Sequence, residues 1–255
     1  MTHFSATAAE PLTGITAAPL SLFLLGATGR TGLPFLLQAL ARGHFVTVYV
    51  RTISKLPAAI AVHPRLRVVT GELHEADKIT LAVRAATPDV VYVMLASERA
   101  PHTAVSTGTH NMLFALRALK ATATGEPGAT PFISIAAWGL GPTGAYITGL
   151  FSRLFVNVAT TLFWSKPLAD FETQLVEVEA AKDAGLIRPT LILPPILTER
   201  AKTNSYLSGE PHLMKDAMGV TNFVSRASIA DLCLKLGERA ASGEAVPQWV
   251  AITNP

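Results

Sequence analysis

The chain has 255 residues, of which 49% are hydrophobic and 15% are charged, whereas roughly 25% are charged in an average soluble domain. This composition excludes a disordered protein, and the length suffices for one large α/β domain with a sizeable core. The single cysteine, Cys233, excludes an intrachain disulfide and a Cys-rich zinc site, so we expect a reducing, cytoplasmic setting and no metal. The net charge of +3 comes from scattered basic residues, which argues against a nucleic-acid partner.

Short apolar runs alternate with helical patterns along the chain. Residues 1–19 are small and polar, contain no Lys or Arg, and are expected to form a flexible tail. Strands are expected at residues 20–25, 45–50, 66–70, 90–95, 132–136, 190–193 and 249–252. Several of these runs are continuous rather than alternating, which is typical of parallel strands covered on both faces. The sequence predicts one α/β domain over residues 20–255: a Rossmann-type, doubly wound parallel sheet with helices on both faces and a small C-terminal substrate-binding portion.

Glycines recur at a spacing of three after the first expected strand. Gly26, Gly29 and Gly32 stand between that strand and an amphipathic helical pattern at residues 33–42. This placement predicts a dinucleotide-binding turn. The first glycine allows the tight turn, the second lets backbone amides approach a pyrophosphate, and the third allows close helix packing. The helix N-terminus supplies N–H donors for phosphates, and further side-chain donors stand at Thr28, Arg30 and Thr31.

The end of the second expected strand predicts which dinucleotide binds. An acidic residue there binds the ribose 2′-hydroxyl of NAD, whereas an arginine accommodates a 2′-phosphate. Here the strand ends in Arg51, 19 residues beyond the last glycine, and Lys55 follows. Because a dianionic phosphate needs cations, we expect NADP(H). The alternative is that Arg51 is only a solvated strand end.

Residues 145–164 form the most apolar stretch of the chain. The stretch is about long enough to span a bilayer, but Arg153 and Asn157 interrupt it, so no stable membrane insertion is expected. A buried or cap helix, an apolar wall of a substrate pocket, a dimer contact and a peripheral membrane role remain open.

An acidic helix is expected from about residue 167 to residue 184. Its apolar side chains recur at helical spacing, and its acidic side chains are expected on a solvated face. The apolar set is Leu168, Phe171, Leu175 and Val178, and the acidic set is Asp170, Glu172, Glu177 and Glu179. Further along, Ser228 followed by Asp231 resembles a capping box that opens the last helix.

Six segments carry a family resemblance: GATGRTG at 26–32, YVRTISKLP at 49–57, GEL at 71–73, VVYVMLAS at 90–97, LILPPIL at 191–197 and FVSRASIADL at 223–232. With them the chain, from about residue 20 to residue 252, resembles the atypical short-chain dehydrogenase/reductase group, in its NmrA-like and biliverdin-IXβ reductase (NADPH-dependent flavin reductase) types. The resemblance implies cofactor contacts at Gly26, Thr28, Gly29, Arg30, Thr31, Gly32, Arg51 and Lys55. It further implies that Glu72 and Leu73 lie by the adenine, that Leu95, Ala96 and Ser97 lie by the inner ribose and phosphates, and that Pro194 and Pro195 lie by the nicotinamide.

The chain departs from this group where the chemistry is expected. None of its four tyrosines is followed by a lysine four residues later, the pair that typical members use as acid and base. The flavin-reductase type places a hydroxyl residue after its fifth strand and a histidine after the Pro-Pro pair, where this chain has Ala137 and Ile196. Ser134 lies three residues earlier and is the catalytic candidate. A strand serine bonded to a neighbouring backbone is the equal alternative.

Apolar side chains surround the expected site. They suit a small hydrophobic or aromatic substrate stacked over the nicotinamide, whereas for each one taken alone an ordinary core position is the simpler alternative. The set comprises Trp138, Tyr146, Phe163, Trp164 and Ile196. His102 and Lys166 are the nearest candidates for a titrating group, and both also fit surface positions.

Three functions follow from these patterns. The first is an NADPH-dependent reductase that transfers hydride to an apolar carbonyl or conjugated acceptor, with positioning as the main contribution of the protein. The second is an NADP(H)-bound scaffold that catalyses a non-redox isomerisation or cyclisation. The third is a non-catalytic regulatory protein that senses NADP(H) and acts through a protein partner.

Overall fold

The computed structural model describes residues 18–97, 101–122, 128–136, 138–139, 165–203, 205–214 and 222–254. The first half of the chain contains β1 (Ser21–Leu25), α1 (Gly32–Ala41), β2 (Phe45–Val50), the 3-10 helix η1 (Ile53–Lys55), α2 (Ala58–Ala61), β3 (Leu66–Thr70), α3 (Ala76–Ala86), β4 (Val90–Val93) and α4 (Ala104–Ala121). The second half contains β5 (Thr130–Ile135), α6 (Ser165–Asp183), β6 (Ile187–Leu193), β7 (Ile196–Thr198), β8 (Leu207–Gly209), α7 (Pro211–Met214), β9 (Phe223–Ser225), α8 (Arg226–Ala241) and β10 (Trp249–Thr253).

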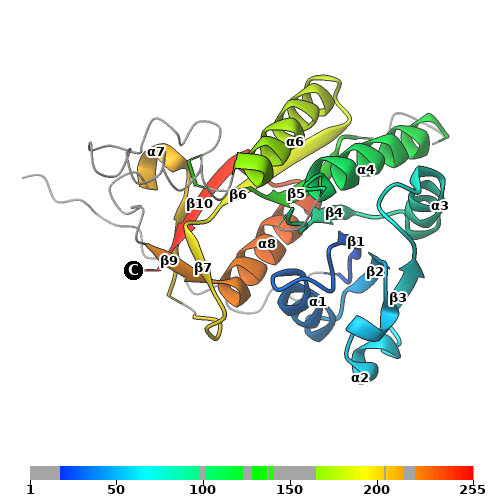
Figure 1. Ribbon diagram of the computed structural model, residues 1–255, viewed down its shortest axis with the longest axis horizontal. Helices are drawn as coiled ribbons and strands as arrows, with labels where there is room; N and C mark the ends of the chain where they lie inside the picture. The colour runs from blue at the N-terminus through cyan, green and yellow to red at the C-terminus, as the bar shows by residue number, and fades with distance from the viewer. Residues whose placement is uncertain are drawn as a thin grey trace, which may run out of the picture.

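The described strands form one large sheet and one small sheet. The large sheet has eight strands in the order β3-β2-β1-β4-β5-β6-β10-β8, and its pairings are parallel except for the antiparallel pair of β10 and β8. The small sheet pairs β7 with β9 in parallel, beyond the carboxyl end of β6. Both faces of the large sheet carry helices (Figure 1), which confirms the predicted Rossmann-type α/β fold.

Two apolar cores lie on the two faces of the sheet. One packs α1 and α8 against the strands and centres on residues such as Leu36 and Leu234. The other packs α3, α4 and α6 and contains Ile79, Met112 and Val178. The central strands are therefore covered on both sides, which explains their continuous runs of Val, Ile and Leu.

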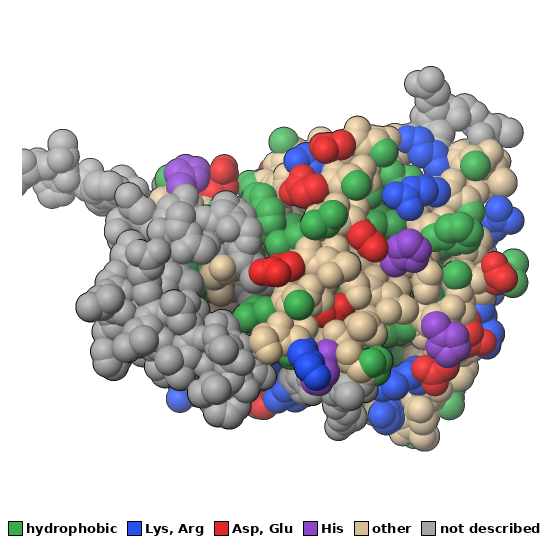
Figure 2. All heavy atoms as spheres, turned by 45° about the horizontal axis from the view of Figure 1, so that its top comes forward, with side chains coloured by type: hydrophobic (Ala, Val, Ile, Leu, Met, Phe, Trp, Pro, Cys, Tyr) green, Lys and Arg blue, Asp and Glu red, His purple; other side chains and the backbone are tan. Residues whose placement is uncertain are grey.

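The expected strand positions are confirmed, with ends that differ by at most three residues. Most of the predicted tail and the whole stretch 145–164 lie outside the described residues. Within the part of the chain that is described, no helix is long and apolar enough to cross a membrane. The face that carries α4 and α6 interleaves acidic, basic and apolar side chains (Figure 2).

Two predictions about helices were wrong. Asp170 of α6 is buried rather than solvated, and the buried residues of this helix are Asp170, Gln174, Val178 and Ala181. Of the predicted apolar set only Val178 is buried, and Leu168, Phe171 and Leu175 are half-buried. The last helix begins earlier than the predicted capping box, because the side chain of Ser225 caps it by accepting a hydrogen bond of 3.0 Å from the Ser228 backbone N–H.

Candidate functional site

The glycine loop lies where the strand order of the sheet reverses. Chain order runs from β1 outward through β2 to β3, then returns to β4 on the other side of β1. Ligands of open α/β sheets bind at this switch point, beyond the carboxyl ends of the strands. The loop after β1 and the loop after β4 therefore face one another across the place where a dinucleotide is expected.

The glycines of this loop are required by its geometry. Gly26 has a left-handed backbone (φ +90°), and a Cβ on it would lie 2.2 Å from the Met94 carbonyl oxygen. A Cβ on Gly32 would lie 2.1 Å from the Gly26 carbonyl oxygen, so α1 begins tightly packed against the loop. The backbone N–H of Gly29 donates to the Gly26 carbonyl at 2.9 Å and closes the turn. A side chain at these positions would fill the loop. Without side chains, the backbone N–H groups can come close to a pyrophosphate.

Basic side chains follow β2 at the same edge of the sheet. Arg51 and Lys55 are exposed, and neither forms an ion pair with any residue in the described ranges. The third predicted cation, Arg30 of the glycine loop, lies 3.6 Å from the carboxylate of Glu199, measured from Nη1 to Oε1. Thr28 and Thr31 are half-buried in the loop, and the Thr31 side chain does not cap α1.

Residues 71–73, which are expected beside the adenine, are held by two hydrogen bonds from neighbouring side chains. The Tyr49 hydroxyl donates to the Glu72 carbonyl at 3.1 Å, and the Asn111 side-chain amide donates to the Leu73 carbonyl at 2.6 Å. Burial, followed by the charge of Glu75, raises the pKa of Tyr49 to about 12. Tyr49 is therefore an anchor that keeps its proton. The exposed Glu72 side chain and the half-buried Leu73 are left at the carboxyl edge.

The loop after β4 contains Leu95, Ala96 and Ser97, of which only Ser97 is buried. The Ser97 hydroxyl donates to the carboxylate of Asp170 and accepts a hydrogen bond of 3.1 Å from the Val105 backbone N–H. Since its proton is committed to Asp170, this hydroxyl cannot donate to a phosphate. His102 holds the same loop, because its Nδ1 lies 2.6 Å from the Ser97 carbonyl oxygen and must carry the proton between them.

Ser134 lies inside the sheet. It is 1% exposed, donates to the Val93 carbonyl at 3.1 Å and accepts from the Gln174 side-chain amide at 2.9 Å. These contacts match the second alternative that the sequence left open, a strand serine bonded to a neighbouring backbone. They give Ser134 a packing role, so it is not retained as a catalytic candidate.

The segments expected beside the nicotinamide meet at the carboxyl ends of β5 and β6. The Trp138 backbone N–H donates to the Pro194 carbonyl at 3.0 Å, and its side chain packs against Met214 of α7 and Ala251 of β10. Pro194 is buried and Pro195 is half-buried. Ile196, the first residue of β7, is 53% exposed. The other expected members of this region, Ala137, Tyr146, Phe163 and Trp164, lie outside the described residues.

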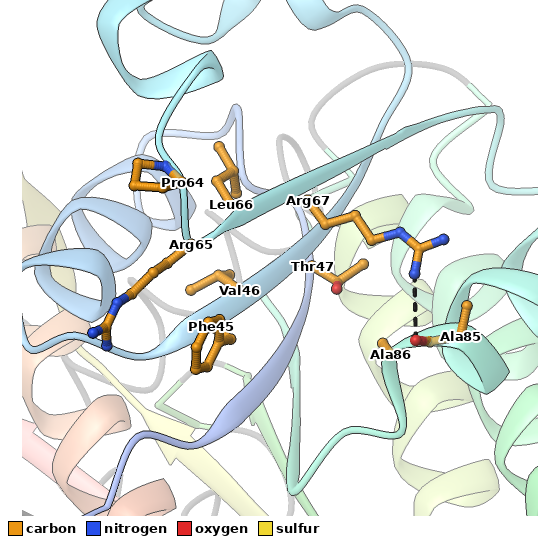
Figure 3. Close-up of a pocket in the computed structure, with 9 residues that line it drawn as sticks. All are labelled: Phe45, Val46, Thr47, Pro64, Arg65, Leu66, Arg67, Ala85 and Ala86. Carbon is orange, nitrogen blue, oxygen red and sulfur yellow. Dashed lines mark hydrogen bonds between the residues drawn. The ribbon is translucent and has the colours of Figure 1, made fainter.

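A hollow of about 220 Å³ lies at the opposite edge of the sheet, by the amino ends of β2 and β3 (Figure 3). Phe45, Arg65 and Arg67 are among its lining residues. Arg65 donates to the Gly43 carbonyl after α1, and Arg67 donates to the Ala85 carbonyl at the end of α3. Both arginines therefore bind backbone carbonyls, Arg67 in the last turn of α3 and Arg65 just beyond the end of α1, and the hollow is remote from the glycine loop.

Sequence reasoning missed the residues that hold the site together. Tyr49, Asn111 and Asp170 were not assigned, because each acts through a long-range hydrogen bond that no local pattern reveals. Glu199 and Arg226 were also missed, although Arg226 stands in the segment FVSRASIADL that carried the resemblance.

Solved structures with the same fold are described as a dehydrogenase/reductase, an oxidoreductase and a reductase. A wide-type short-chain dehydrogenase/reductase from Veillonella parvula, solved in complex with NADP, is 15% identical, with a TM-score of 0.65 over 92% of this chain and 94% of that one. The oxidoreductase ylbE from Lactococcus lactis is 14% identical, with a TM-score of 0.64 over 92% and 90% of the two chains. The anaerobilin reductase ChuY from Escherichia coli O157:H7 is 18% identical, with a TM-score of 0.62 over 92% and 97%. At these identities the likeness shows the fold.

The sequence itself gives the family. The family model described as NAD(P)H-binding matches residues 26–239, a span that starts at the first glycine of the loop and ends near the C-terminus of α8. Because this match covers most of the chain and agrees with the fold and with the glycine cradle, the protein belongs to the NAD(P)H-binding family.

Proposed function

We propose that the protein is an NADPH-dependent oxidoreductase that reduces a small hydrophobic or aromatic carbonyl or conjugated compound. The observation that carries the cofactor assignment is the pair of exposed cations after β2, Arg51 and Lys55, for which no carboxylate partner is found among the described residues. A 2′-phosphate would supply the missing negative charge.

The nucleotide lies against four segments, which follow β1, β2, β3 and β4. The cradle of Gly26, Gly29 and Gly32 holds the pyrophosphate against the start of α1. Arg51 and Lys55 hold the 2′-phosphate, and the 71–73 segment lies along the adenine. Leu95, Ala96 and the backbone of Ser97 line the inner ribose.

The nicotinamide end is bordered by Pro194, Pro195 and Trp138. A bound reduced nicotinamide supplies a hydride, and the protein orients the acceptor. Trp138 and Met214 form an apolar wall beside Pro194, which supports a hydrophobic or aromatic acceptor. We include Ile196 and the expected side chains Tyr146, Phe163 and Trp164 in the proposed pocket.

The proton that completes the reduction comes from water in this proposal. Ser134 is committed to Val93 and Gln174, and Tyr49 is an anchor with a raised pKa. Acceptors whose reduced form is stabilised by conjugation suit such a site, because they need little general-acid assistance. With Cys233 buried and unpaired, we further propose a cytoplasmic location.

The test is turnover with a panel of acceptors. Purified protein is mixed with NADPH and with flavins, quinones, enones or aldehydes, and the absorbance band of the reduced cofactor is followed. Loss of that band with matching formation of reduced acceptor supports the proposal, and a Gly26→Ala variant, which cannot form the cradle, is the inactive control. Tight NADPH binding with no turnover of any acceptor would contradict it. Product formation without cofactor consumption would then favour the non-redox scaffold, and NADP(H)-dependent capture of a protein would favour the regulator.

A further inference from the structure

One carboxylate lies between two arginines at the carboxyl edge of the sheet. Glu199 Oε1 is 2.7 Å from Arg226 Nη1 and 3.6 Å from Arg30 Nη1. The side chains of Glu199 and Arg30 are 61% and 56% exposed, whereas that of Arg226 is 11% exposed. Glu199 is therefore bound tightly to one cation and loosely to the other.

The tight pair is set by the small sheet. Thr198 at the end of β7 is in register with Ser225 at the end of β9, so the residues that follow, Glu199 and Arg226, start side by side. The Arg226 guanidinium then donates to Glu199 with normal hydrogen-bond geometry. This pairing holds the carboxylate at a fixed place beside the glycine loop.

The loose pair involves a residue of the proposed nucleotide site. Arg30 stands between Gly29 and the start of α1, in the loop that is proposed to hold the pyrophosphate. Of the three cations assigned to the nucleotide, Arg51 and Lys55 have no carboxylate partner in the described part of the chain, whereas Arg30 has Glu199. A phosphate that enters the loop must compete with Glu199 for Arg30.

We propose that Glu199 is a competing counterion that tunes the affinity of the site for the phosphates of NADP(H). On binding, Arg30 exchanges the exposed, 3.6 Å contact with Glu199 for a charge-assisted contact with phosphate, which is the stronger of the two. Arg226 keeps Glu199 and neutralises it, so the carboxylate is not left unpaired beside the phosphates. This inference rests on the proposed function.

The test is the dissociation constant of NADPH for the Glu199→Gln variant, measured by titration of cofactor fluorescence without an acceptor. We expect about threefold to tenfold tighter binding at low salt, and a smaller gain at high salt because exposed charges are screened. If Glu199 instead serves to hold Arg30 in a productive position, the same variant binds more weakly, so the sign of the change separates the two roles.

Two controls decide whether the gain in NADPH affinity of the Glu199→Gln variant acts through Arg30. Glu244 follows α8 and its exposed carboxylate pairs with Arg239 of that helix. Glu244→Gln changes the net charge by the same amount as Glu199→Gln, so it should leave NADPH binding unchanged. In an Arg30→Ala background, Glu199→Gln should give no gain, because the competition has been removed. Weaker or unchanged binding by Glu199→Gln, or a gain that persists without Arg30, would overturn the inference and leave the proposed function intact. Failure of the unaltered protein to bind NADPH would overturn both.

Discussion

The carboxylate of Asp170 accepts a hydrogen bond of 2.9 Å from the Val105 backbone N–H, which joins α6 to the first turn of α4. The backbone N–H of Ser106 donates to the same carboxylate at 3.1 Å, and the Ser97 hydroxyl donates to it as well. The residue before α4, Thr103, provides no side-chain cap. Asp170 thus accepts hydrogen bonds from backbone N–H groups that have no partner within α4. Its negative charge lies at the N-terminus of α4, where the helix dipole stabilises it.

Replacement of Asp170 by Asn should destabilise the protein. The amide can still accept a hydrogen bond, but it brings N–H donors against the N–H donors of α4 and removes the charge. We expect a loss of about 2 kcal/mol in the free energy of unfolding, measured by urea denaturation. Glu172→Gln on the exposed side of the same helix is the matched control and should change stability by less than about 0.5 kcal/mol. Equal stability of Asp170→Asn and the unaltered protein would show that the cap contributes nothing.

The cofactor preference should depend on Arg51. An aspartate there would repel a 2′-phosphate but could accept hydrogen bonds from a ribose 2′-hydroxyl. We expect Arg51→Asp to weaken NADPH binding by about 10-fold to 100-fold, on the basis of roughly 1.5–3 kcal/mol for a lost charged hydrogen bond. NADH binding should change much less. Arg67→Asp makes the same charge change near the amino end of β3 and serves as the control. Equal losses for NADPH and NADH would contradict the assignment of Arg51.

Substitution of Tyr92 is expected to increase the stability of the protein. Its hydroxyl is buried in β4 and has no hydrogen-bond partner among the described residues, and burial raises the pKa of this phenol well above its usual value. Because an unpaired buried hydroxyl costs free energy, Tyr92→Phe should raise the free energy of unfolding by about 1 kcal/mol. Tyr49→Phe removes a hydroxyl that donates to the Glu72 carbonyl, so it should lower stability by about the same amount. Loss of stability in both variants would mean that the Tyr92 hydroxyl has a partner after all.

The parts of the fold that the sequence predicts well are those whose cause is local. The glycine loop is one example, because Gly26 and Gly32 have no space for a Cβ and the spacing alone reveals the turn. The central strands are another, since burial on both faces demands continuous apolar runs. The strands β7 and β9 have only three residues each and give no such signal, which is why the neighbourhood of Glu199 and Arg226 was not predicted.

The mispredicted helix face has a long-range cause. Asp170 and Gln174 are polar, so a pattern of apolar side chains puts them on the solvated side of α6. Their partners lie 40 or more residues away in sequence: Gln174 donates to Thr109 and to Ser134, and Asp170 accepts from the start of α4. Buried polar groups are tolerated when they are hydrogen-bonded in this way, and only the tertiary structure supplies the partners.

A buried carboxylate on α8 should make the protein sensitive to acid. Asp231 is 2% exposed and accepts from Arg42 at 2.6 Å and from Tyr206 at 2.9 Å, and its carboxylate lies 2.8 Å from Lys235 Nζ. Burial alone would raise the pKa of Asp231, but hydrogen bonds from Lys235 and Tyr206 and the nearby lysine charges outweigh it, so the pKa is lowered. Glu238 behaves in the same way: burial opposes ionisation, but its contacts with His44 and Arg42 lower the pKa.

A lowered folded-state pKa gives a defined pH dependence. The folded protein holds these protons less tightly than the unfolded chain does, so the stabilisation is complete above the unfolded-state pKa values of about 4 and is lost as the pH falls through the lower folded-state values. We expect the free energy of unfolding to fall steeply below about pH 4. Asp231→Asn should cost about 2 kcal/mol at neutral pH, because charged hydrogen bonds to half-exposed cations are lost, and should flatten the fall of stability at acid pH. Asp183→Asn, at the exposed end of α6, should keep the steep fall. An unchanged fall at acid pH in Asp231→Asn would mean that this carboxylate is not the group whose protonation unfolds the protein.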